Sequence, residues 1–95
     1  MEEIEKEIRQ AADEALEQLE IADTTLSDVV QHRASYDFDL MKFSVQYREA
    51  TGKYFRVVVN VIEVMQEYGN HSVEAFRRKI IQLLQERDPN DYMTN

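Results

Sequence analysis

The sequence predicts an all-α fold, a small single domain of four to five helices joined by short turns. Two observations support it: apolar residues recur every three or four positions along most of the 95 residues, and only two glycines and one proline interrupt them. A hydrophobic content of 43% also indicates a folded chain, which at this length buries roughly 60–65% of its unfolded surface. We therefore predict a helical bundle domain over residues 1–88 and a flexible tail over residues 89–95.

The first predicted helix covers residues 2–22. Its apolar residues are Ile4, Ile8, Ala11, Ala15, Leu19 and Ala22, at steps of three and four. Glu2 and Lys6 form a favourable i,i+4 pair, and the acids of the first turn suit the positive end of the helix dipole. This pattern indicates a helix that buries one side and exposes an acidic one.

Two more helices are predicted in the middle of the chain. Polar residues before Leu26 can cap a helix over residues 25–33, although the sequence also allows a continuation of the first helix, a kink or a loop. Ser35 or Asp37 can cap a further helix that runs to about Ala50.

Over residues 54–65, the strand propensity of the residues and the spacing of the polar positions predict different elements. The β-branched residues there favour a strand. The polar residues nevertheless recur at steps of three and four, namely Lys53, Arg56, Asn60, Glu63 and Glu67. A strand would also place Glu63 on its apolar face, so we predict a central, largely buried helix.

The clearest turn signal lies at Gly69, which can adopt a left-handed conformation, and Ser72 can act as an N-cap. The apolar residues after Ser72 predict a last helix that ends at Asp88-Pro89. Together these elements give residues 53–87 the pattern of a helix-turn-helix.

Charge is distributed unevenly along the chain. Residues 1–39 contain twelve acids and three bases, whereas residues 40–95 carry a net charge of +1, which leaves −8 overall. An acidic half of this kind repels nucleic acid and membrane phosphates and attracts basic protein surfaces. It also provides a solvated helical face that keeps a small protein soluble.

Several classes of chemistry lack the residues that they need. The chain has no cysteine, which excludes disulfides and Cys-ligated metals and fits a reducing compartment. His32 and His71 stand apart from any metal-ligand spacing, and two isolated glycines cannot form a phosphate-binding loop. We therefore expect no enzymatic activity, no cofactor and no metal. The acidic amino terminus and the lack of a long apolar run lead us to expect a cytoplasmic protein without membrane contacts.

The leading functional hypothesis is a small acidic inhibitor or adaptor that competes for a basic, nucleic-acid-binding surface of a partner protein. Its expected contact residues are Glu3, Glu7, Glu14, Glu17 and Asp28. In size, charge and predicted helicity the chain resembles the small acidic proteins of phages and mobile elements, among them nucleic-acid mimics and antirestriction proteins. This general resemblance assigns no residues.

Two alternatives remain open at this stage. One is a dimeric DNA-binding transcriptional regulator that uses the helix-turn-helix pattern, with Arg77, Arg78 and Lys79 on its recognition helix. The other is a self-associating structural or assembly subunit, whose contact residues would be Phe38, Met41 and Phe43. Only the first alternative has nucleic acid as a direct ligand, and both allow a homodimer.

Overall fold

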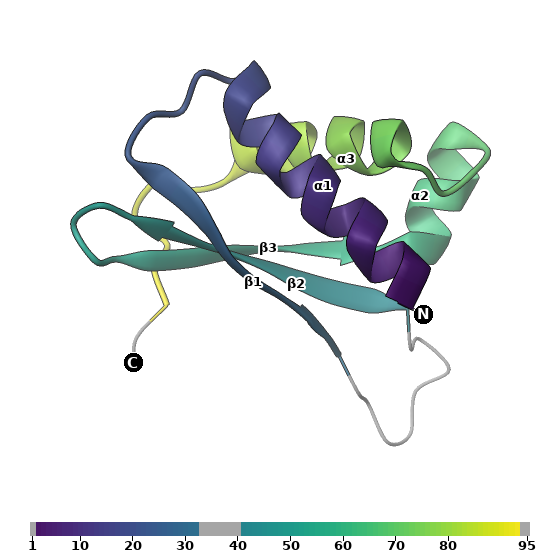
Figure 1. Ribbon diagram of the computed structural model, residues 1–95, viewed down its shortest axis with the longest axis horizontal. Coiled ribbons are helices and arrows are strands. Elements are labelled where there is room, and N and C mark those ends of the chain that lie inside the picture. The colour runs from purple at the N-terminus through teal and green to yellow at the C-terminus, as the bar shows by residue number, and fades with distance from the viewer. Residues whose placement is uncertain (1, 33–40, 94–95) are drawn as a thin grey trace.

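The computed structural model, which describes residues 2–32 and 41–93, is an α+β fold and not a helical bundle (Figure 1). The helices are α1 (Glu2–Gln18), α2 (Val61–Tyr68) and α3 (Val73–Glu86). The strands are β1 (Thr24–Gln31), β2 (Lys42–Glu49) and β3 (Tyr54–Asn60). The predicted all-α class is therefore wrong, because three segments that were expected to be helical are extended.

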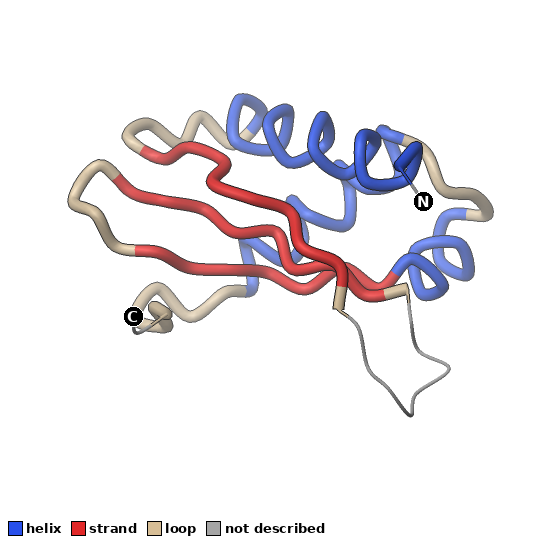
Figure 2. The backbone as a smooth tube through the Cα atoms, turned by 60° about the horizontal axis from the view of Figure 1, so that its bottom comes forward, coloured by secondary structure: helices blue, strands red, loops and turns tan. Residues whose placement is uncertain are grey.

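The three strands form one antiparallel sheet in the order β1-β2-β3 (Figure 2). β2 and β3 pair without interruption from Lys42 opposite Asn60 to Arg48 opposite Tyr54. Helices α1 and α3 lie side by side over one face of the sheet (Figure 1). None of the described helices covers the opposite face.

The predicted helix over residues 54–65 is wrong in its first half. Phe55, Val57 and Val59 point into the core while Arg56 and Val58 point outward, which is the period of two of a strand. The spacing of the polar residues was misleading, because the step of four residues from Arg56 to Asn60 fits both the period of a helix and that of a strand. Glu63 does not disturb the strand, because β3 ends at Asn60 and α2 begins at the next residue.

The helix predicted over residues 25–33 is replaced by β1. Leu26 and Val29 both lie on the helix-covered side of the sheet, although three residues separate them, as on one side of a helix. A bulge between Leu26 and Asp28 explains this spacing, because the extra residue returns Val29 to the face on which Leu26 lies. The bulge thus makes a strand imitate helical periodicity.

The helix predicted from Ser35 or Asp37 to Ala50 falls partly on residues 33–40, which lie outside the described residues. Its second half is strand β2, with alternating buried side chains at Phe43, Val45 and Tyr47. Gly52, with a φ of +91°, belongs to the turn between β2 and β3.

The remaining helix predictions are confirmed, with shifted ends. α1 forms from Glu2 but stops at Gln18 rather than at residue 22. Gly69 ends α2 in a left-handed conformation with a φ of +82°. The Ser72 hydroxyl accepts a hydrogen bond from the Ala75 amide, which caps the first turn of α3.

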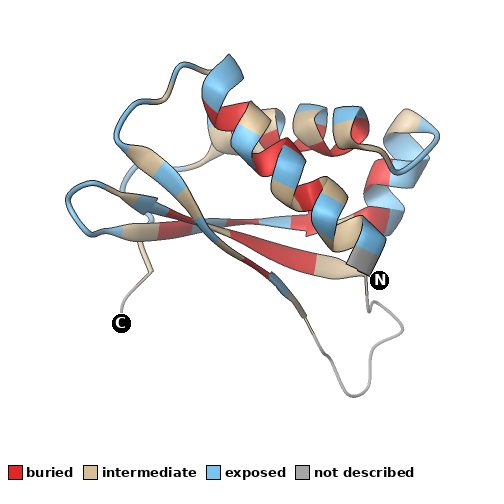
Figure 3. Ribbon diagram, viewed as in Figure 1, coloured by how far each residue is buried: buried red, intermediate tan, exposed pale blue. Residues whose placement is uncertain are grey.

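The core lies between the sheet and the helix layer, where the buried residues face each other (Figure 3). Ala11, Ala12 and Ala15 of α1 are fully buried, and these small side chains let the helix backbone come close to the elements packed against it. The Tyr47 hydroxyl, from the central strand, donates a hydrogen bond of 3.0 Å to the Ala12 carbonyl oxygen. Tyr47 therefore links the two layers through the middle of the core.

Residues after α3 return to the sheet beside β3. The Met93 amide donates to the Tyr54 carbonyl over 2.9 Å, and the Tyr92 hydroxyl donates to the Glu49 carboxylate over 3.0 Å. The outer edge of β3 is thus covered at one end. Among residues 2–32 and 41–93, no helix is long and apolar enough to cross a membrane.

Replacing Tyr47 with Phe should lower the free energy of unfolding by about 1 kcal/mol at pH 7, because the hydrogen bond to Ala12 is lost. Burial, followed by the nearby charge of Asp13, raises the pKa of Tyr47 above its ordinary value of 10.0. A raised pKa contributes stability that is complete below the ordinary value and is lost as the pH rises from there toward the folded-state pKa, so the wild-type protein should lose stability above pH 10 more steeply than Tyr47→Phe. Urea unfolding at pH 7 and pH 10.5 measures both effects, and parallel curves would contradict the assignment.

Candidate functional site

Two acids of the expected contact set lie on the side of α1 that faces α3. Glu7 is 3.1 Å from His71 Nδ1, and Glu14 accepts a hydrogen bond of 3.2 Å from the Arg77 guanidinium. Both carboxylates therefore have partners within the described chain. Their position indicates that they help to hold α3 against α1.

Asp28 lies on strand β1 and not on a helix. Its Oδ1 accepts one hydrogen bond from the Val29 amide over 2.8 Å and another from Arg9 on α1 over 3.0 Å. The carboxylate thus satisfies a backbone group at the edge of the sheet. Asp28 is committed to an internal contact, which the sequence pattern alone did not indicate.

The other two acids of the set, Glu3 and Glu17, are exposed on α1. Glu17 lies close to two acids that the sequence analysis did not select, Asp13 and Glu20. All three border a groove between the last turns of α1 and the first residues of β1. Their common location depends on where α1 ends, which the helix prediction placed four residues too late.

This acidic groove has a volume of about 660 Å³ and is open to solvent. It is lined by Asp13, Leu16, Glu17, Glu20, Ile21, Ala22, Thr24, Thr25 and Leu26. Leu16 belongs to the core, and Ile21 and Leu26 pack against that core while remaining partly exposed. The groove therefore combines an apolar floor with a rim of three carboxylates.

The end of α1 fixes the shape of the groove. The Ile21 amide donates to the Leu16 carbonyl over 3.0 Å, and the Glu20 amide donates to the Glu17 carbonyl over 3.1 Å. These two bonds form a Schellman motif, in which the residue at Glu20 must be left-handed. Glu20 has a φ of +54°, and Asp23 follows with a φ of +62°.

The basic triplet proposed for a recognition helix is mostly neutralised within the fold. Arg77 pairs with Glu14, and Arg78 pairs with Glu74 one turn earlier on α3. Lys79 is only 5% exposed, and its ammonium group lies 2.6 Å from Glu63 and 3.1 Å from Glu67. The segment 53–87 also begins with strand β3, so it is not a helix-turn-helix.

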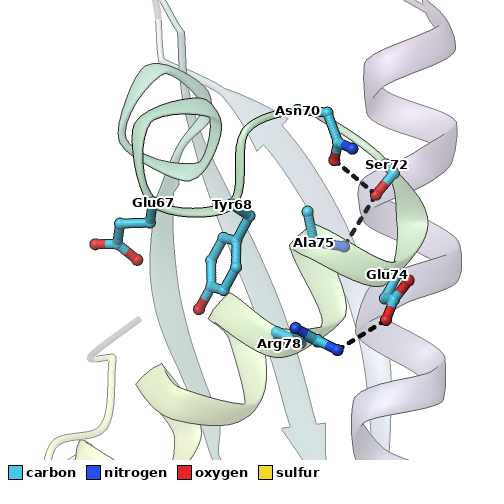
Figure 4. A pocket seen from close by; sticks show the side chains of 7 residues that line it. All are labelled: Glu67, Tyr68, Asn70, Ser72, Glu74, Ala75 and Arg78. Carbon is cyan, nitrogen blue, oxygen red and sulfur yellow. Dashed lines mark hydrogen bonds and ion pairs between the residues drawn. The ribbon is translucent and has the colours of Figure 1, made fainter.

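A smaller pocket of about 310 Å³ lies at the turn between α2 and α3 (Figure 4). It is lined by Glu67, Tyr68, Asn70, Ser72, Glu74, Ala75 and Arg78. Most of its polar groups bind each other: the Ser72 hydroxyl donates to Asn70, and Arg78 donates to Glu74. These contacts indicate that the polar groups lining the pocket stabilise the turn.

Two of the residues expected for self-association, Met41 and Phe43, lie among the described residues. Phe43 is 1% exposed and belongs to the core, and Met41 packs partly against it. Phe38 lies outside the described residues.

His32 and Ser44 form a pair that the sequence spacing did not indicate. The His32 Nε2 lies within hydrogen-bond distance of the Ser44 Oγ. Such a pair resembles a base and a nucleophile, but Ser44 is only 2% exposed. Because a buried hydroxyl cannot reach a substrate, we assign this hydrogen bond to the stability of the sheet.

Comparisons of the chain with protein-family profiles, with curated proteins and with solved structures found no match. The candidate site therefore rests on the geometry and charge described above.

Replacing Glu20 with Gly should raise the free energy of unfolding by up to about 1 kcal/mol, because only glycine adopts a left-handed conformation without steric cost. Glu17→Gly is the matched control, since it removes the same charge from within α1. It should lower stability by about 1 kcal/mol. Thermal unfolding of the two variants measures the difference, and a loss of stability in both would contradict the described end of α1.

Replacing Glu63 with Gln tests the Lys79 cluster. The hydrogen bond from Lys79, assisted by its charge, lowers the pKa of Glu63 despite partial burial. A lowered pKa stabilises the folded state above the ordinary value of 4.5, and this contribution disappears as the pH falls through the folded-state pKa. Glu63→Gln should therefore be less stable than the wild-type protein at pH 7, by less than about 1 kcal/mol because the Glu63 side chain is half exposed. The difference should be smaller at pH 3 than at pH 7, whereas Glu86→Gln should match the wild-type protein at both pH values.

Proposed function

We propose that the protein is a non-catalytic protein-binding module that uses the acidic groove to bind a basic segment of a partner protein. In this proposal the partner's basic surface also holds nucleic acid, and the module competes with that ligand. The groove replaces the broader acidic face of the leading hypothesis and retains Glu17 from its contact set.

The observation that supports this proposal is the position of three unpaired acids at the C-terminal end of helix α1. Asp13, Glu17 and Glu20 have no ion-pair partner among residues 2–32 and 41–93. Asp13 and Glu17 are four residues apart on α1, and like charges at this spacing destabilise a helix by about 0.2–0.5 kcal/mol. Acids near a helix C-terminus also oppose the dipole, and α1 has no basic residue in its last turn.

Local stability therefore does not explain these acids, whereas a cationic partner does. Lysine or arginine side chains in the groove would neutralise three charges at once. A charged groove of this kind also speeds encounter with a basic protein, because electrostatic attraction acts before contact.

The floor of the groove adds a second requirement on the partner. Leu16, Ile21 and Leu26 provide an apolar centre inside the charged rim, which is the usual arrangement of a protein interface. The partner segment should therefore carry an apolar side chain between basic ones. Nucleic acid fits this groove poorly, because its phosphates would face the carboxylates.

The test compares two double variants with the same net charge. Asp13→Lys with Glu17→Lys changes the groove, whereas Glu86→Lys with Asp91→Lys changes exposed acids at the end of α3 and in the tail. The wild-type protein and the control should retain the same nucleic-acid-binding partners from a host lysate. The groove variant should bind the purified partner at least roughly tenfold more weakly, with a shallower salt dependence.

Competition is measured with the purified partner and its own nucleic acid. Added wild-type protein should release the nucleic acid, and the groove variant should not. Equal binding and equal salt dependence of all three proteins, with circular dichroism showing that each is folded, would overturn the proposal.

A further inference from the structure

We infer that the partner segment binds in an extended conformation, as a short added strand along residues 24–26 of β1. This inference rests on the proposed function, which supplies the basic partner, and it adds the backbone geometry of binding. An extended segment that joins a sheet edge gains hydrogen bonds from its main chain and specificity from alternate side chains.

β1 is the free edge of the sheet next to the groove. The sheet order is β1-β2-β3, so each outer strand has one side without a strand neighbour. The outer side of β3 is covered in part by the Met93–Tyr54 contact. No described segment pairs with the outer side of β1.

The register identifies which backbone groups of β1 point outward. The Asp23 carbonyl accepts a hydrogen bond from the Ala50 amide, just beyond the end of β2, so the backbone groups of Asp23 point toward β2. In an antiparallel pair, successive residues direct their backbone groups alternately toward and away from the partner strand. Thr24 and Leu26 therefore direct their amides and carbonyls away from β2, and no backbone hydrogen bond within the described chain reaches them.

The second half of the same edge is closed. The Asp28 carboxylate accepts the hydrogen bond of the Val29 amide, and Arg9 pairs with that carboxylate. The bulge before Asp28 also interrupts the regular spacing that an added strand needs. Only residues 24–26 remain open, and these are the residues of β1 that line the acidic groove.

The groove determines the side chains that such a strand would present. Side chains at alternate positions share one face. An apolar side chain opposite Thr24 would contact the floor between Ile21 and Leu26, and basic side chains two residues away on either side, opposite Ala22 and Leu26, would extend toward the carboxylates of Glu17 and Glu20. The predicted segment is therefore basic-x-apolar-x-basic, where x faces away from α1.

Synthetic pentapeptides with blocked ends test this pattern. The probe has the sequence Lys-Thr-Val-Thr-Lys, and its control has the same composition in the order Thr-Lys-Val-Lys-Thr, which moves both lysines to the other face. Titration followed by NMR should show at least roughly fivefold tighter binding of the probe. Amide exchange at Thr24 and Leu26 should slow when the probe is bound.

Backbone methylation separates strand addition from charge attraction. In the probe, N-methylation of the valine and the two lysines removes one alternate set of amides, and N-methylation of the two threonines removes the other set. Methylation of one set of amides should abolish binding, and methylation of the other set should leave the affinity within roughly twofold. An added strand uses the amides of only one of its edges.

The outcomes distinguish this inference from the proposed function. If both peptide orders and both methylated probes bind equally, but Asp13→Lys with Glu17→Lys still weakens them, strand addition is wrong and the acidic groove stands. If that double variant binds the probe as tightly as the wild-type protein does, the proposed function itself fails.

Discussion

The position of α1, which packs against α3 and the edge strand β1 and is joined to the central strand through Tyr47, is the constraint on which the rest of the structure depends. It requires small side chains at the fully buried positions Ala11, Ala12 and Ala15, because larger ones there would push the helix away from the elements packed against it. The buried Tyr47 hydroxyl obtains its hydrogen-bond partner by donating to a carbonyl of the helix. Once α1 is fixed in this way, its final turns must pass over the start of β1, and the groove follows from that crossing.

The charge pattern divides α1 into two sides with different tasks. Toward α3, Glu7 and Glu14 meet His71 and Arg77, so those acids contribute to packing. Toward β1 and solvent, the acids at the end of the helix form no ion pair among the described residues. An acidic composition read from the sequence alone treats both groups alike, although only the second group is available to a partner.

The parts of the fold that could be predicted from the sequence are those specified locally. α1 and α3 follow from their apolar spacing, and the intervening turn follows from Gly69 and Ser72. The strands could not be predicted by the same rule, because the bulge gives β1 a helix-like spacing and because the four-residue step from Arg56 to Asn60 in β3 fits both a helix and a strand. Glu17 was identified correctly as an exposed acid. Its neighbours in the groove were missed, because they come together only through the left-handed residue that ends α1.

The contact between Asp28 and the Val29 amide also affects the tendency of this protein to aggregate at high concentration. A long bare strand edge can recruit the same edge of another copy and grow into insoluble assemblies. Here one carboxylate and its arginine close the apolar part of that edge, where Val30 is already 41% exposed on the outer face. Loss of Asp28 would lengthen the open edge from residues 24–26 toward Val30, so we expect that loss to promote aggregation more than unfolding.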